Sequence, residues 1–214
     1  MPIDISKTWL FRIIPLQILA HNLQHGLHCK NAGVVDPNYI AIGSQEVISR
    51  RDNVMVKCYT DTVVNDYVPF YFSVRTPMLY NIHTGRGVPA FPQEGIVYLC
   101  FKLAGLATAG FQWCFTDGNA AAAITRFFNN LDDLEQLDWH SIGTTDFRDQ
   151  NADGDEDRVR KKHSEFLVKD YVPMEHLAVI VVKSQAMKER VEAILIECNI
   201  EIPVHINPRN KFYF

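Results

Sequence analysis

The sequence predicts a fold that mixes β-strands and α-helices in one large domain, or at most two small ones. The chain has 214 residues, of which 47% are hydrophobic and 21% charged, the balance of an ordinary folded protein. Short apolar runs rich in aromatic and β-branched residues predict the strands. Segments with apolar side chains three and four positions apart predict the helices.

Strands are expected wherever such an apolar run is bounded by turn residues. They cover residues 8–14, 39–43, 67–72, 96–102, 111–115, 177–182 and 202–206. A further short strand is expected just after Glu165, because three strand-forming residues follow it. The continuous apolar run at 177–182 indicates a strand that is buried on both faces.

Helices are expected over residues 16–27, 44–51, 120–128, 130–137 and 184–198. Gly26 suits a C-cap and Ser44 an N-cap. Thr76-Pro77 is expected to end the aromatic strand in a turn, and residues 81–87 are expected to form a polar loop with two glycines.

Composition excludes several classes of protein. No apolar run has membrane-spanning length and no signal peptide pattern is present, so we expect a cytoplasmic protein without membrane contact. Five cysteines without a CxxC pair indicate reduced core thiols. A net charge of −4 argues against broad nucleic-acid affinity but allows a local basic groove.

Residues 149–157 imitate the first part of a calcium-binding EF-hand loop. The twelfth position of such a loop needs a bidentate glutamate, and here it is Arg160. Position eight, normally apolar, is Glu156. An exposed acidic loop is the better interpretation. His21, His25 and His28 lack a carboxylate partner nearby, so we expect no metal site there either.

One stretch is more specific than composition. Residues 66–85 read DYVPFYFSVRTPMLYNIHTG, which alone indicates a core strand and its exit turn. The order DYVPFYF followed by R-x-PMLYNI-x-x-G resembles the DarT family, toxins that transfer ADP-ribose from NAD to a DNA base. Further matches to the family pattern cover essentially the whole chain: Arg12-Ile13, residues 26–29, Leu137-Asp138-Trp139, Ser164-Glu165 before a strand, Val172-Pro173 and the aromatic end 211–214.

The resemblance implies an α+β fold of the ADP-ribosyltransferase type, with a split, bent β-core flanked by helices in a single domain 1–214. It implies Glu165 and Arg51 as catalytic residues, although adjacent Arg50 leaves the choice of arginine open. NAD would be the co-substrate, without a metal. The residues implied to hold NAD are Arg12, Ile14, Pro15, Gly26, Gly43, Arg51, Tyr67, Tyr71, Phe72 and Met78.

The resemblance also implies single-stranded DNA as the partner. A substrate-recognition loop at about 141–163 is expected, and a macrodomain-type antitoxin is the expected protein partner. The implied DNA-binding residues are Arg75, Arg148, Arg158, Arg160, Lys161 and Lys162. In the thymidine-modifying branch the acceptor is N3 of thymine, which must lose a proton to attack, and Glu165 is a candidate for that base. N3 is occupied in a duplex, so the base must be unpaired.

Two positions depart from the family pattern, since Pro15 and Ile18 stand where a histidine and an asparagine usually help to hold NAD. Asn22 lies on the same helical face as Ile18 and is a candidate substitute. One alternative is therefore a weakened or inactive member that binds DNA or a partner. Another is an active enzyme with a different target: guanine in DNA, RNA or protein.

Overall fold

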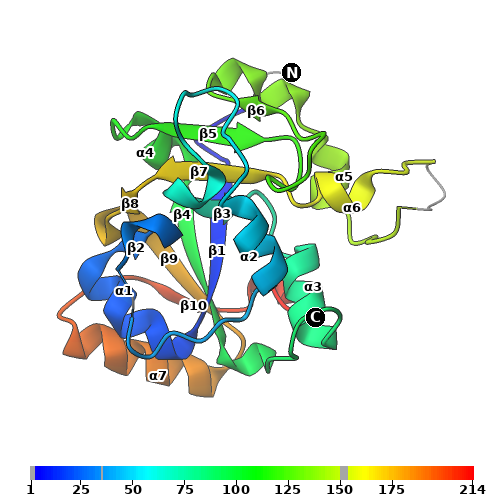
Figure 1. The fold of residues 1–214 in the computed structure, drawn as a ribbon. Coiled ribbons are helices and arrows are strands. Elements are labelled where there is room, and N and C mark those ends of the chain that lie inside the picture. Colours follow the sequence, from blue (N-terminus) through cyan, green and yellow to red (C-terminus); the bar gives the residue numbers. More distant parts are fainter. Residues whose placement is uncertain (1–2, 35, 150–153) are drawn as a thin grey trace.

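The computed structural model describes residues 3–34, 36–149 and 154–214, and its centre is an eight-stranded sheet (Figure 1). The strand order is β10-β9-β4-β1-β3-β7-β5-β6. The strands are β1 (Trp9–Pro15), β3 (Tyr67–Tyr71), β4 (Ile96–Lys102), β5 (Trp113–Thr116), β6 (Phe127–Phe128), β7 (Glu165–Lys169), β9 (Leu177–Val182) and β10 (Val204–Ile206). A separate two-stranded sheet joins β2 (Leu27–His28) to β8 (Tyr171–Val172).

The large sheet is split between β1 and β3. Strand β1 pairs with β4 along its whole length, from Trp9↔Lys102 to Pro15↔Ile96. Within the described residues, β1 and β3 share a single registered pair, Phe11↔Tyr71. Two half-sheets result, and Figure 1 shows β5 and β7 running across the direction of β1, β4 and β9.

Helices cover both faces of the half-sheet that contains β1. On one face α1 (Leu19–His25) and α7 (Gln185–Glu197) pack their leucines and Val191 against β1, β4 and β9. On the other face α3 (Pro77–Thr84) and the C-terminus pack against Ile13 and Tyr98. The remaining helices are short: α2 (Gln45–Arg51), α4 (Leu103–Thr108), α5 (Trp139–Gly143) and α6 (Arg158–Lys161).

The predicted α+β class is confirmed, and most predicted elements are present. The prediction of a strand at 39–43 is wrong, because that segment pairs with no strand among the described residues and instead borders a cavity. The predicted loop 81–87 is half helical, since Thr76 accepts a hydrogen bond from Leu79 N–H and starts α3 instead of a turn. Residues 16–18 form a 3-10 turn before α1, and 131–136 form a 3-10 helix.

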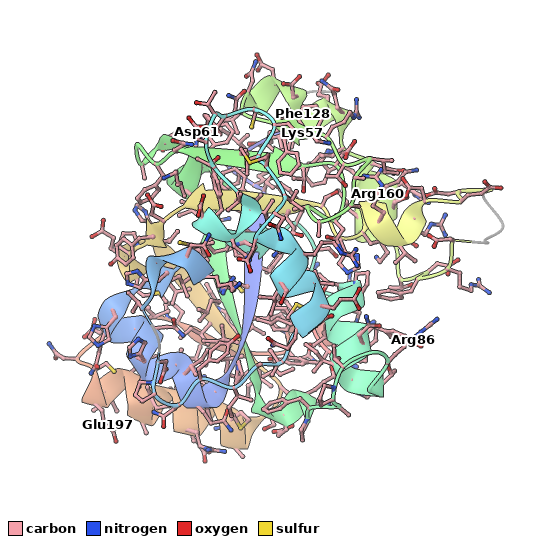
Figure 2. The ribbon with its side chains drawn as sticks, viewed as in Figure 1. Lys57, Asp61, Arg86, Phe128, Arg160 and Glu197 are labelled. Carbon is pink, nitrogen blue, oxygen red and sulfur yellow. The ribbon has the colours of Figure 1, made fainter. Side chains whose placement is uncertain are left out.

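The predicted helix 120–128 is wrong, although its alanines favour helix. The backbone there bonds to side chains instead: Lys57 Nζ donates to the carbonyls of Ala123 (3.1 Å) and Thr125 (2.7 Å). Phe127 and Phe128 then form β6 beside β5. Lys57 and Phe128 lie together in the upper part of Figure 2.

Membrane-spanning helices and metal-ligand groups are both absent among the described residues. No helix there is long and apolar enough to cross a membrane. No group of three or more His, Cys, Asp or Glu side chains in the described ranges is arranged to hold a metal. Part of the loop that imitates an EF-hand, residues 150–153, lies outside the described residues.

Tyr213 anchors the C-terminus against the sheet, and its side chain is buried. Its hydroxyl lies 2.9 Å from the Ile96 carbonyl and 3.0 Å from the Val181 carbonyl, so it connects the chain end to β4 and β9. Removing this hydroxyl leaves buried carbonyls without that donor, which typically costs 1–3 kcal/mol.

We therefore expect Tyr213→Phe to lower the free energy of unfolding by about 1–2 kcal/mol, measured by chemical denaturation. The matched control is Tyr39→Phe, because Tyr39 is 57% exposed and should change stability by less than about 0.5 kcal/mol. Equal losses in both variants would contradict the role given to the buried hydroxyl.

Candidate active site

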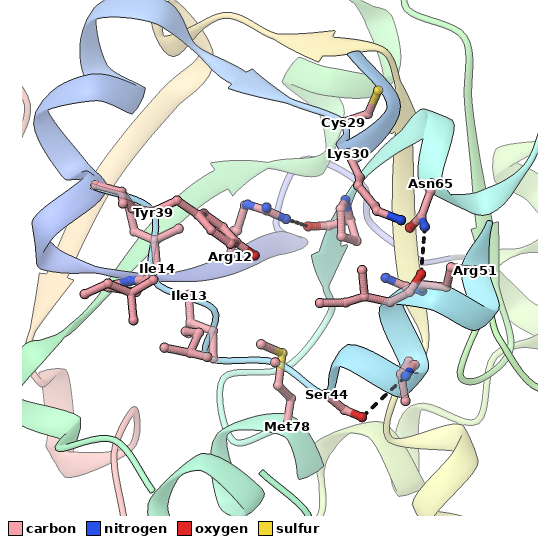
Figure 3. Close-up of a pocket in the computed structure, with 18 of the residues that line it drawn as sticks. Arg12, Ile13, Ile14, Cys29, Lys30, Tyr39, Ser44, Arg51, Asn65 and Met78 are labelled. Atoms are coloured by element: carbon pink, nitrogen blue, oxygen red, sulfur yellow. Dashed lines mark hydrogen bonds between the residues drawn. The ribbon is translucent and has the colours of Figure 1, made fainter. Parts of the chain in front are cut away.

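A cavity of about 500 Å³ opens where the sheet splits. It is lined by residues of β1, α1, α2, β3 and β7, together with Val34 and several residues of segment 36–44, which has no helix or strand. Binding sites for small molecules commonly have this size. Figure 3 shows Arg12 and Arg51 reaching the cavity from two different elements, β1 and α2.

Glu165 is the first residue of β7 and is 2% exposed. One carboxylate oxygen pairs with the guanidinium of Arg51, and the other accepts a hydrogen bond from the backbone N–H of Ala120 (3.4 Å). Its own backbone N–H donates to the hydroxyl of Thr116 (3.1 Å). The carboxylate is therefore fixed in position and compensated by one buried cation.

The structure distinguishes the two adjacent arginines. Ser44 caps α2 by accepting from the Val47 N–H (3.4 Å), a bond marked in Figure 3, and the helix then ends at Arg51. Arg51 is 14% exposed and faces Glu165, whereas Arg50 is 54% exposed and pairs with Glu46. Burial acts to lower the pKa of Arg51, but the charge of Glu165, the neighbouring Tyr71 and the hydrogen bond to Glu165 together raise that pKa.

Arg12 crosses the split in the sheet. One terminal nitrogen of its guanidinium donates to the Pro69 carbonyl of β3 (2.9 Å), in place of the missing strand pairing. The Nε atoms of Arg12 and Arg51 are both buried without a hydrogen-bond partner in the described chain. Burial lowers the pKa of Arg12, yet an arginine stays protonated in a protein. Two cations thus border the cavity, and each has one buried N–H group without an acceptor among the described residues.

Tyr71 lies beside Glu165 in the sheet, because the two residues are partners in the β3–β7 register. Its hydroxyl donates to the sulfur of Met78 (3.4 Å). Burial, and then the charge of Glu165, raise the pKa of Tyr71, so it remains a neutral phenol. Gly43 borders Met78, since a side chain at Gly43 would begin 3.5 Å from the Met78 methyl group.

Near α1, the cavity wall includes a glycine that no larger residue could replace without a clash. Gly26 has φ +79°, and a Cβ there would fall 2.2 Å from the ring of Tyr171. Most of the predicted NAD-site residues border this one cavity: Arg12, Ile14, Pro15, Gly26, Gly43, Arg51, Tyr67, Tyr71 and Met78. Glu165 borders it as well.

Comparison with known proteins identifies the chain. The family model described as "ssDNA thymidine ADP-ribosyltransferase, DarT" matches residues 11–214. The chain belongs to the DarT family. A DNA ADP-ribosyl transferase of Escherichia coli O127:H6 is 34% identical over 210 residues, which cover 98% of this chain and 94% of that protein.

Solved DarT structures share the fold. The DarT of Thermus sp. 2.9 in complex with ADP-ribosylated single-stranded DNA superposes with a TM-score of 0.89 at 29% identity, covering 100% of this chain and 99% of that one. The same Thermus protein in complex with NAD+ gives a TM-score of 0.80 at 27% identity, with 100% of both chains covered. The predicted fold of the ADP-ribosyltransferase type is therefore confirmed.

Phe72, which the resemblance implies as an NAD-site residue, lies elsewhere in the structure. It does not border the cavity but packs against Phe115, Trp139 and Phe166, with ring centroids 5.4–6.4 Å apart. Successive residues of an extended segment point to opposite faces, so Tyr71 in the cavity places Phe72 in the core. Ile18 and Asn22 do border the cavity, and the Asn22 amide donates to the Ile18 carbonyl (2.8 Å).

The basic residues predicted to bind DNA are engaged inside the molecule. Arg158 and Lys162 are buried, Arg158 beside Asp146 and Lys162 against the carbonyls of Ser141, Ile142 and Thr144. Such positions contradict direct phosphate contact by these two side chains in this conformation. Burial lowers the pKa of Lys162 to about 8.

The other four predicted DNA-binding residues also have protein partners. Arg160, labelled in Figure 2, pairs with Asp117 (2.9 Å) and Asp157 (2.6 Å). Lys161 pairs with Asp138 and Asp155, and Arg75 donates to the carbonyls of Asn210 and Tyr213 near the C-terminus. Arg148 pairs with Asp146 and its side chain is 75% exposed, far more than those of Arg158, Arg160 and Lys161.

His163 borders the cavity and was missed as a site residue. The sequence places it at the end of a basic run, and nothing in that pattern separates it from the neighbouring cations. In the structure its ring is 6.4 Å from that of Tyr71, and Glu165 follows two residues later.

The buried pair predicts unequal effects at the two arginines of α2. Arg51→Met should lower the free energy of unfolding by about 3 kcal/mol, because it leaves the buried charge of Glu165 without its cation. Arg50→Met is the control and should change it by less than about 0.5 kcal/mol, since that pair is exposed. Chemical denaturation at neutral pH measures both, and equal losses would refute the assignment of Arg51.

Proposed function

We propose that this protein transfers ADP-ribose from NAD to N3 of thymine in single-stranded DNA. The observation that carries the proposal is the Glu165–Arg51 pair at the wall of a cavity in which Arg12 and Arg51 hold unused donors. Membership of the DarT family supports the same reaction.

The residues fit NAD. The cavity, of about 500 Å³, has the size expected for such a ligand. Two buried arginine N–H groups without partners suit a pyrophosphate, because an unpaired buried donor is costly until an acceptor arrives. Tyr71 and Met78 supply an apolar wall for a ring or ribose.

Bound NAD supplies an activated ribose, whose C1′ gains positive charge as the bond to nicotinamide breaks. The carboxylate of Glu165 is placed to stabilise that charge, because it is buried where the effective dielectric constant is low. Arg51 and the Ala120 N–H hold the carboxylate in place without reorganisation during the reaction. The target base must be unpaired to reach the cavity.

The inactive alternative is not supported. Pro15 and Ile18 replace two polar side chains, but the predicted charged residues Arg12, Arg51 and Glu165 all border the cavity, and the matched relatives are named as transferases. Asn22 supplies an amide at the same wall. We extend the proposal to a toxin role in the cytoplasm, opposed by a macrodomain-type antitoxin that removes the ADP-ribose.

The test incubates the protein with NAD and a thymine-containing single-stranded oligonucleotide and measures the product by intact mass spectrometry. We expect one ADP-ribose per modified thymine and none on an oligonucleotide of the other three bases. Glu165→Ala and Glu165→Gln should lower the rate at least about 100-fold, because the stabilising charge is lost. Circular dichroism should show that both variants remain folded.

The control variant is Glu175→Gln, whose side chain is 78% exposed and does not border the cavity. It should modify DNA at the wild-type rate. An adduct on an oligonucleotide without thymine would indicate another base as the target. No adduct on any oligonucleotide, with folded protein, would favour the inactive alternative.

A further inference from the structure

His163 is held by the end of α6 with its ring at the cavity wall. The ring nitrogen Nδ1 lies 2.9 Å from the Val159 carbonyl, one helical turn back. The backbone N–H of His163 donates to the Arg160 carbonyl (3.0 Å), which fixes the residue as the helix ends. The orientation of the ring is therefore set by its own helix.

This contact fixes the tautomer of a neutral imidazole. A carbonyl oxygen only accepts, so Nδ1 must carry the proton and Nε2 must carry the lone pair. Nε2 is on the far side of the ring from Val159, and no hydrogen bond joins it to any described residue. His163 thus presents an unused acceptor at the wall that also contains Glu165.

The other polar groups around Glu165 are poor acceptors of a proton. Arg51 is charged, and Tyr71 keeps its proton because burial raises its pKa. Both oxygens of Glu165 already accept hydrogen bonds, from Arg51 and from the Ala120 N–H. His163 differs from all three, since it combines a free lone pair with a basicity suited to neutral pH.

We propose that His163 accepts the proton of the target base through Nε2, an inference that rests on the proposed function. The N3–H proton of thymine passes to Nε2, and the electron pair left on N3 forms the bond to ribose C1′. Nicotinamide leaves with the electron pair of its former bond to C1′, which makes its ring neutral. The imidazolium that results is stabilised by the negative charge of Glu165.

The charges around the ring set the pH dependence. Burial lowers the pKa of His163 below its usual 6.5. The hydrogen bond to the Val159 carbonyl and the charge of Glu165 on β7 oppose this effect, and the charges of Arg51 on α2 and Lys162 at the end of α6 add to it. The neutral form that accepts a proton is therefore the major form at pH 7. The transfer rate should rise with pH up to the pKa of His163 and be level above it.

The first experiment compares wild type with His163→Gln across pH, under saturating NAD and oligonucleotide. At neutral pH the variant should be slower by about 100-fold to 10,000-fold, the usual contribution of general base catalysis. Its rate should keep rising at alkaline pH, as thymine itself loses the proton. His205→Gln is the matched control, because His205 is an exposed residue of β10, and it should keep the wild-type profile.

The second experiment reads the tautomer without turnover. Nitrogen-15 NMR of the free protein should show a protonated Nδ1 and an unprotonated Nε2 for the histidine whose signal disappears in His163→Gln. A protonated Nε2 at neutral pH would overturn the inference. So would a His163→Gln variant that keeps the wild-type rate and pH profile while wild type modifies thymine, and the proposed function would then still stand. A wild type that modifies no base would instead overturn both.

Discussion

The missing pairing between β1 and β3 is the constraint on which the site depends. A continuous ladder would bring the two strands within hydrogen-bonding distance along their length and leave no room for a cavity. Pro69 cannot donate to such a ladder, and its carbonyl is satisfied by the side chain of Arg12 instead. The split therefore leaves space for a ligand and places a buried cation beside it, without leaving that carbonyl unpaired.

Burial of Glu165 is tolerable because Arg51 accompanies it. An unpaired carboxylate in this position would be heavily penalised, whereas a paired one with an additional backbone donor is compensated. The same pairing limits what Glu165 can do, since each of its oxygens already accepts one hydrogen bond and the nearby charge of Arg51 makes the carboxylate a weaker base. Electrostatic stabilisation suits such a fixed carboxylate, and proton transfer suits a side chain with an unused lone pair.

Sequence patterns correctly predicted the elements whose formation depends on neighbouring residues. Strand Ile96–Lys102, strand Leu177–Val182 and the Ser44 cap follow from apolar runs and capping chemistry, and the structure confirms them. The resemblance, not the pattern, selected Glu165 and favoured Arg51. The helix expected at 120–128 failed because Lys57, remote in sequence, takes the carbonyls of Ala123 and Thr125.

The basic run at 158–163 illustrates why charge counts in a sequence do not predict a binding surface. Each cation needs a partner when it is buried, and here Asp117, Asp146, Asp155 and the carbonyls at the end of α5 supply partners. These charges join the described parts of the segment, 141–149 and 154–163, and contribute little to a long-range field, in keeping with a net charge of −4. A run of cations in the sequence therefore does not by itself predict a basic surface, because buried charges are compensated within the molecule.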